Sequence, residues 1–141
     1  MGLDVSPSVI GLALSDPSLR LATPFHTLYR NKWKPDAREL LLLIDQREVV
    51  GLIVGWPLNM DGTEGPRCQS VRQFAHNFLK LRDMPLCLWD ERLSTQAVKN
   101  ALSAAGASRK RIETIADQHA ASYILQGALD ALQHISSAAS Q

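Results

Sequence analysis

The stretch GLDVSPSVIGLALS, residues 2–15, sets the fold of this chain. Two short runs rich in Val, Ile and Leu, at residues 2–5 and 10–15, flank the turn-forming segment Ser6-Pro7-Ser8. This pattern is typical of a β-hairpin. A third extended run follows at residues 21–29. We therefore expect the chain to open with three antiparallel strands.

Helical and extended patterns alternate after these strands. Helical spacing of apolar residues predicts a helix over 36–47, with Asp36 as its N-cap and Glu39 completing a capping box. The continuous apolar run at 49–55 is typical of a strand buried on both faces. The other expected elements are a loop at 56–65, a helix from 66 to about 82, a strand at 86–89, a helix from a cap at Ser94-Thr95 to Gly106, and a helix over 108–135. This order predicts an α/β fold whose mixed five-stranded sheet carries helices on both faces.

Length and composition favour one globular domain. The chain has 141 residues, of which 45% are hydrophobic and 21% are charged, so we expect a single domain over 1–135 and a flexible tail at 136–141. The net charge of +1 provides no overall attraction to nucleic acid or membrane, so binding must come from local patches. Because the two cysteines have no CxxC spacing and no apolar run reaches membrane-spanning length, we expect a cytoplasmic protein, monomer or homodimer, with no membrane association.

Acidic residues occur in apolar surroundings at three points of the sequence. Asp4 lies within the first strand, Asp90 and Glu91 follow a later strand, and Asp117 lies among Ile and Ala residues of the last helix. A buried carboxylate is costly unless it is paired, hydrogen-bonded or bound to metal. Each position alone is more often structural, but together they predict an Mg²⁺ or Mn²⁺ site for phosphodiester chemistry. Neighbours on a strand face opposite ways, so only one of Asp90 and Glu91 is expected in the site.

Four blocks of the chain resemble signature motifs of the YqgF/RuvX family. They are GLDV with IGLALSD at 2–5 and 10–16, VGWPLNMDG at 54–62, DERLST at 90–95, and Asp117 followed by ILQ at 124–126. The blocks occur in the family's order across nearly the whole chain. The resemblance implies an RNase H-like fold related to Holliday-junction resolvases, and a nuclease that matures the 5′ end of pre-16S ribosomal RNA. It also implies that Asp4, Glu91 and Asp117 are the catalytic, metal-binding acids, with Glu91 preferred over Asp90.

The turn at Ser6-Pro7-Ser8-Val9 departs from the family pattern. The family usually has Gly in place of Ser6 and basic residues near Ser8 and Val9. We expect the loss of Gly to restrict the turn, and the loss of positive charge to remove a phosphate contact beside Asp4. Both changes predict reduced catalysis.

Positive charge is concentrated in the stretch that directly follows Asp90 and Glu91. Between residues 92 and 112 there are five basic residues and no acidic one. Four of them are predicted to bind the phosphate backbone of the substrate, with Arg92 the best single candidate: Arg92, Arg109, Lys110 and Arg111. The alternative is a solvated helix face. The loop at 55–65 contains glycines, and two interpretations fit it equally, a phosphate-binding loop or a simple connection between strand and helix. Its Asp61 is either a further metal ligand or a turn residue.

These observations predict a metal-dependent nuclease acting on RNA, with ribosomal RNA precursor as the expected substrate. Two alternatives stay open from the sequence. One is a dimeric DNA nuclease that resolves branched junctions, and the other is a non-catalytic ribosome-assembly or nucleic-acid-binding factor. Retention of all three acids argues against the second alternative.

Overall fold

The computed structural model describes residues 1–139, without the side chains of residues 94–97 and 116–118. The elements follow the predicted order, three strands and then alternating helices and strands. They are β1 (Gly2–Val5), β2 (Val9–Ser15), β3 (Ala22–Tyr29), α1 (Trp33–Gln46), β4 (Leu52–Trp56), α2 (Pro66–Leu81), β5 (Leu86–Asp90), α3 (Arg92–Ala104) and α4 (Arg109–Ala139).

The five strands form one mixed sheet in the order β3-β2-β1-β4-β5. β1, β2 and β3 are antiparallel neighbours, whereas β1, β4 and β5 run parallel to one another. The predicted sheet and its antiparallel first three strands are confirmed. Because parallel strands end at the same edge, the residues that follow β1, β4 and β5 lie close together in space.

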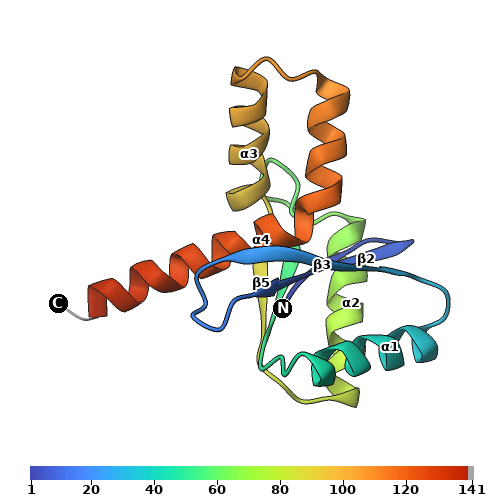
Figure 1. Ribbon diagram of the computed structural model, residues 1–141. Coiled ribbons are helices and arrows are strands. Elements are labelled where there is room, and N and C mark those ends of the chain that lie inside the picture. Colours follow the sequence, from blue (N-terminus) through green and yellow to red (C-terminus); the bar gives the residue numbers. More distant parts are fainter. Residues whose placement is uncertain (140–141) are drawn as a thin grey trace.

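Helices cover both faces of the sheet, as predicted (Figure 1). On one face, α1 and α2 pack on the main hydrophobic core, in which Leu3 and Val5 of β1 are buried. On the other face lies the later part of α4. This helix approaches the sheet so closely that a Cβ on Gly2 would lie 2.7 Å from the Cβ of Leu125. Glycine at this position therefore sets the packing distance of α4.

α3 and the first part of α4 form a helical hairpin that projects away from the sheet (Figure 1). Gly106, between the two helices, has φ +88°, a conformation that favours glycine. The predicted end of α3 at Gly106 is confirmed by its C-cap at Ala105. No helix in the described part of the chain is long and apolar enough to cross a membrane.

Four predicted boundaries are wrong by a few residues. β4 begins at Leu52 and not at the expected residue 49. α1 begins at Trp33, so Asp36 lies within its first turn, where its carboxylate accepts the backbone N–H of Asn31 instead of capping the helix. α3 begins before Ser94-Thr95, because Glu91 is its N-cap. α4 continues through Ala139, past the expected end at residue 135, and residues 140–141 of the predicted tail lie outside the described residues.

Candidate active site

Asp4 projects from the central strand toward the face covered by α4. Its neighbours Leu3 and Val5 are buried in the core on the opposite face, as strand alternation requires. Asp4 pairs in register with Gly11 of β2 and lines a cleft of about 390 Å³ together with Ala121 and Ser122 of α4. The half-buried carboxylate is therefore fixed on a rigid strand and open to a cleft.

Glu91 lies directly after β5, with its side chain over Gly55 of β4. The backbone N–H of Glu91 donates to the carbonyl of Trp56 at 3.2 Å, which extends the β4–β5 pairing by one residue. A Cβ on Gly55 would lie only 2.6 Å from Oε1 of Glu91. Only glycine at residue 55 leaves room for this carboxylate.

The carboxyl group of Glu91 is partly buried and has a raised pKa. Its Oε1 is buried and has no hydrogen-bond partner in the described part of the chain. Burial, and after it the negative charge of Asp4, raise the pKa of Glu91 from 4.5 to about 7, whereas Arg67 acts to lower this pKa. The charge of Asp4 thus acts on Glu91, which places the two carboxylates at the same end of the sheet, and their shared role as metal ligands stays a prediction.

A divalent cation suits this pair of carboxylates. A buried carboxylate oxygen without a hydrogen-bond donor, next to a second carboxylate, presents the hard oxygen ligands that Mg²⁺ and Mn²⁺ prefer. The third predicted ligand, Asp117, lies on α4, but its side chain falls outside the described residues. Among the side chains that are described, no group of three His, Cys, Asp or Glu lies close enough to hold one ion.

Asp90, unlike its neighbour Glu91, has its carboxylate in an ion pair with Arg92. Nη2 of Arg92 donates to Asp90 Oδ2 at 2.8 Å, Nε donates to the same carboxylate, and the backbone N–H of Arg92 also donates to it. Nη1 of Arg92 donates to the carbonyl of Met60 at 3.2 Å. Arg92 therefore braces the loop after β4 through part of its guanidinium, and its predicted contact with a phosphate stays a prediction.

The basic residues Arg109, Lys110 and Arg111 lie at the far end of the projecting hairpin, at the start of α4 (Figure 1). All three are exposed, and Arg109 pairs with Glu113 one turn further along the helix. The structure does not bring them beside Asp4 and Glu91. The expected single patch next to the acids is therefore wrong, because α3 separates the acids from these residues.

The turn after Asp4 is unstrained and carries positive charge from elsewhere in the chain. The backbone N–H and Oγ of Ser6 both donate to the carbonyl of Val9, and Ser6 is not among the residues with positive φ. Nη1 of Arg30 donates to the carbonyl of Ser6 at 2.9 Å, and Nη2 of Arg67 donates to that of Val5 at 3.2 Å. Ser6 therefore adopts this turn without the conformation that favours glycine, and the expected loss of a phosphate contact beside Asp4 stays a prediction. Neither arginine stands out in the sequence as a candidate, since Arg30 directly follows β3 and Arg67 lies in α2.

The loop at 56–65 is organised by its own hydrogen bonds. Asp61 is exposed and accepts the backbone N–H and the hydroxyl of Thr63, which lowers the pKa of this carboxyl. The backbone N–H of Gly62 donates to the carbonyl of Asn59. These contacts favour the interpretation of Asp61 as a turn residue and of the loop as a connection between β4 and α2.

Comparison with known proteins places the chain in a family. A family model described as "RuvX: Holliday junction resolvase" matches residues 1–131. A protein of Paramagnetospirillum magneticum named "Putative pre-16S rRNA nuclease" is 56% identical over 130 residues, 92% of this chain and 84% of the relative. Proteins of the same name from Rhodopseudomonas palustris (strain BisB18) and Ruegeria pomeroyi are 51% and 49% identical, over 98% and 95% of this chain and 85% and 87% of their own lengths. This chain belongs to the RuvX family and has its RNase H-like fold, which confirms the resemblance seen in the sequence motifs.

Proposed function

We propose that this chain is a metal-dependent nuclease that hydrolyses phosphodiester bonds, with the 5′ end of the pre-16S ribosomal RNA precursor as its substrate in the cytoplasm. The observation that carries this proposal is the buried Oε1 of Glu91, which has no donor in the described part of the chain and lies near the charge of Asp4. The shared name of the relatives, at about half identity over nearly the whole chain, supports RNA as the substrate.

Asp4 and Glu91, together with Asp117 as the sequence resemblance implies, would hold Mg²⁺ or Mn²⁺. When bound, such an ion activates water as a nucleophile and stabilises the charge that develops on the leaving oxygen of a phosphodiester. Asp4 contributes a ligand whose position is fixed by pairing on both sides of β1. Glu91 contributes a ligand that is buried against Gly55, so water competes poorly for it.

The protonation state of Glu91 couples ligand binding to pH. Because its pKa is raised to about 7 by burial and by Asp4, part of the population carries a proton on Glu91 at neutral pH. A cation can bind this carboxyl only in the ionised form. Arg67 and Lys99 lower the pKa of Glu91 and so favour the form that binds a cation.

A second substrate class deserves a direct test, because the family model is described as a Holliday junction resolvase. Purified protein should be incubated with a labelled RNA that spans the 5′ end of the 16S sequence and with a four-way DNA junction. Each substrate is tested with Mg²⁺, with Mn²⁺ and with chelator. We expect cleavage of the RNA with a divalent cation and none with chelator.

Asp4→Asn and Asp117→Asn test the acids. Each change keeps the side-chain volume and removes a negative ligand, so we expect cleavage to fall at least about 100-fold, which corresponds to about 2.7 kcal/mol of transition-state stabilisation. Asp83→Asn, at an exposed position between α2 and β5, is the matched control and should keep the wild-type rate. The nuclease proposal fails if the wild type cuts neither substrate with either cation while Asp117→Asn still supports ribosomal RNA maturation in cells.

A further inference from the structure

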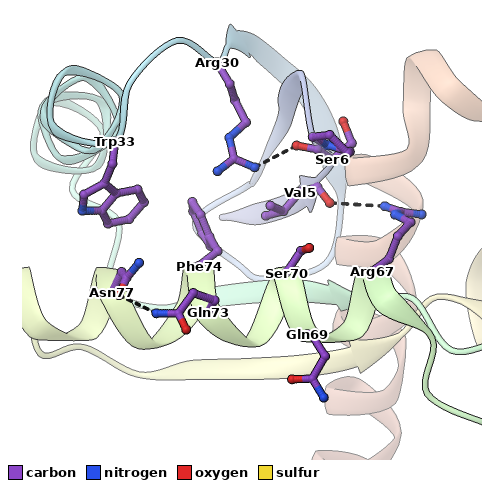
Figure 2. Close-up of a pocket in the computed structure, with 11 residues that line it drawn as sticks. Val5, Ser6, Arg30, Trp33, Arg67, Gln69, Ser70, Gln73, Phe74 and Asn77 are labelled. Carbon is purple, nitrogen blue, oxygen red and sulfur yellow. Dashed lines mark hydrogen bonds between the residues drawn. The ribbon is translucent and has the colours of Figure 1, made fainter.

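A second pocket opens at the same end of β1 as Asp4, on the face covered by α1 and α2. Its volume is about 570 Å³, and its walls come from the turn after β1, the end of β3, the start of α1 and the first half of α2. Figure 2 shows Arg30 and Arg67 reaching toward the turn from two different sides. Nothing in the site described above uses this pocket.

The two arginines of this pocket are positioned but not neutralised. Nη1 of Arg30 is tied to the carbonyl of Ser6, and Nη2 of Arg67 to that of Val5. Among the residues that the structure describes, neither arginine forms an ion pair, and no acidic side chain lines the pocket. Each guanidinium has five N–H donors, so each keeps donors available for an anion. Two fixed, uncompensated guanidinium groups are typical of phosphate recognition.

The rest of the pocket wall combines aromatic and polar groups. Trp33 is half-buried and meets the ring of Phe74 edge-on, with 5.6 Å between centroids. The guanidinium of Arg30 lies 5.9 Å from the centre of the Phe74 ring, which orients it across the pocket. In Figure 2 the side chain of Ser70 on α2 lies between Phe74 and Arg67. Such a wall presents a flat indole beside a phosphate site, which suits the nucleoside attached to a phosphate.

The pocket is close to the acids. Val5, whose carbonyl anchors Arg67, directly follows Asp4 in β1. Arg67 is also near enough to Glu91 to act on the carboxyl's protonation. A strand whose scissile phosphate lies at Asp4 and Glu91 can therefore continue past the end of β1 into the pocket on the other face.

We propose that the pocket between Arg30 and Arg67 binds a phosphodiester of the single-stranded part of the substrate, with the adjoining nucleoside against Trp33. This inference rests on the proposed nuclease function, because it names a subsite for the same substrate. It assigns to Arg30 and Arg67 a phosphate contact in addition to the one predicted for Arg92.

The test measures binding of a labelled single-stranded RNA oligonucleotide by fluorescence anisotropy, in chelator, over a series of salt concentrations. Arg30→Ala and Arg67→Ala should each weaken binding at low salt and lower the slope of log affinity against log salt by about 0.7. Lys80→Ala removes one positive charge from the exposed side of the same helix α2 and should leave the slope unchanged. Ser70→Asp adds a carboxylate to the pocket wall, removes no anchoring contact of either arginine, and should weaken binding as strongly.

Thermal melting separates loss of binding from loss of folding. If an arginine variant melts well below the wild type, Ser70→Asp decides the result, because its position is exposed on α2. Slopes equal to the wild type in all three pocket variants would overturn the proposal, as would the absence of RNA binding by the wild type in chelator. A nucleoside monophosphate that binds as tightly as the oligonucleotide would also overturn it, since the pocket would then serve a free nucleotide.

The same experiment distinguishes failure of the pocket from failure of the nuclease function. If the wild type cleaves RNA but the pocket variants keep its salt slope, the subsite is wrong and the nuclease stands. If the wild type binds RNA through the pocket arginines but cleaves neither substrate, the subsite stands and the nuclease is wrong.

Discussion

The two faces of the sheet carry opposite charge at the end of β1, where Asp4 and Val5 are consecutive residues. Asp4 faces α4 and lies close to Glu91, so this face carries two carboxylates. The carbonyl of Val5 accepts a hydrogen bond from Arg67, and the next carbonyl accepts one from Arg30, so the face of α1 and α2 carries two guanidinium groups. Although the net charge of the chain is only +1, carboxylates and guanidinium groups thus gather on opposite faces of the sheet at the end of β1.

The comparison shows that the two faces need different kinds of support. The two carboxylates repel each other, and burial favours the neutral form of Glu91, so the acid face depends on the space above Gly55 and is suited to a cation. The arginines depend on backbone carbonyls, which fix a guanidinium without neutralising it. We therefore expect the acid face to respond to metal and pH, and the arginine face to respond to salt.

Gly55→Ala should break the acid face with the largest effect. The new Cβ would lie 2.6 Å from both Glu91 Oε1 and Ile124 Cδ1, so Glu91 must move away from Asp4. We expect cleavage to fall at least about 100-fold, while the free energy of unfolding falls by only about 1–3 kcal/mol, because flexible side-chain ends absorb the clash. Cleavage assays and urea denaturation of the same preparation measure the two effects.

Gly11→Ala is the matched control on the neighbouring strand. A Cβ there would lie 3.7 Å from the Cβ of Ala121 and 3.8 Å from that of Asp4, both ordinary contacts. We expect stability within about 0.5 kcal/mol of the wild type. Wild-type cleavage by Gly55→Ala would contradict the placement of Glu91 as a ligand.

The pH dependence of stability should sharpen the comparison with a smaller effect. In the metal-free protein the pKa of Glu91 is raised from 4.5 to about 7, so the folded state holds a proton that the unfolded state has released. The contribution of Glu91 to stability is therefore fully present below pH 4.5 and is lost as pH rises toward 7. Relative to Glu91→Gln, we expect the wild type to lose on the order of 3 kcal/mol across this range.

Urea denaturation in chelator, at several pH values, measures this difference between wild type and Glu91→Gln. Adding Mn²⁺ at pH 7 should restore stability to the wild type, because the cation binds the ionised carboxylates, and should do so less in Glu91→Gln. Parallel stability curves for the two proteins in chelator would show that Glu91 titrates normally and that its burial has no energetic consequence.

Local patterns in the sequence predict most of the fold but not the starts of two helices. Alternation and helical spacing are properties of neighbouring residues, so β1 and α2 are placed well. The start of α3 instead depends on the hydrogen bond from Glu91 to the carbonyl of Trp56 on another strand, which no local pattern near Ser94 reveals. Asp36 likewise has the sequence of a cap, yet it bonds to the backbone N–H of Asn31 from inside the helix.

The acids of the site are predictable, whereas its cations are not. A carboxylate in an apolar strand, such as Asp4, stands out in the sequence because its burial requires an explanation. Arg30 and Arg67 look like ordinary surface charges, and they meet the turn after β1 across 24 and 62 residues of chain. Arg92 illustrates the converse, since Asp90, two residues earlier, was a visible signal that its charge is already paired.

The basic hairpin tip should show the smallest effect of all. α3 starts directly after Glu91 and has 13 residues, so its far end lies roughly 20 Å from Glu91. That span equals roughly six base pairs of duplex, so a short single strand bound at the acids cannot reach Arg109, Lys110 and Arg111. The triple change to Ala should leave cleavage of a short RNA within about twofold of the wild type, a difference of about 0.4 kcal/mol.

The same triple change should lower the salt slope of binding only for substrates with a longer duplex arm. Binding assays with a short and a long substrate measure this difference in slope. An equal loss of affinity for both lengths would show that the tip folds back to the acids in solution and that the two faces at the end of β1 do not hold the substrate alone.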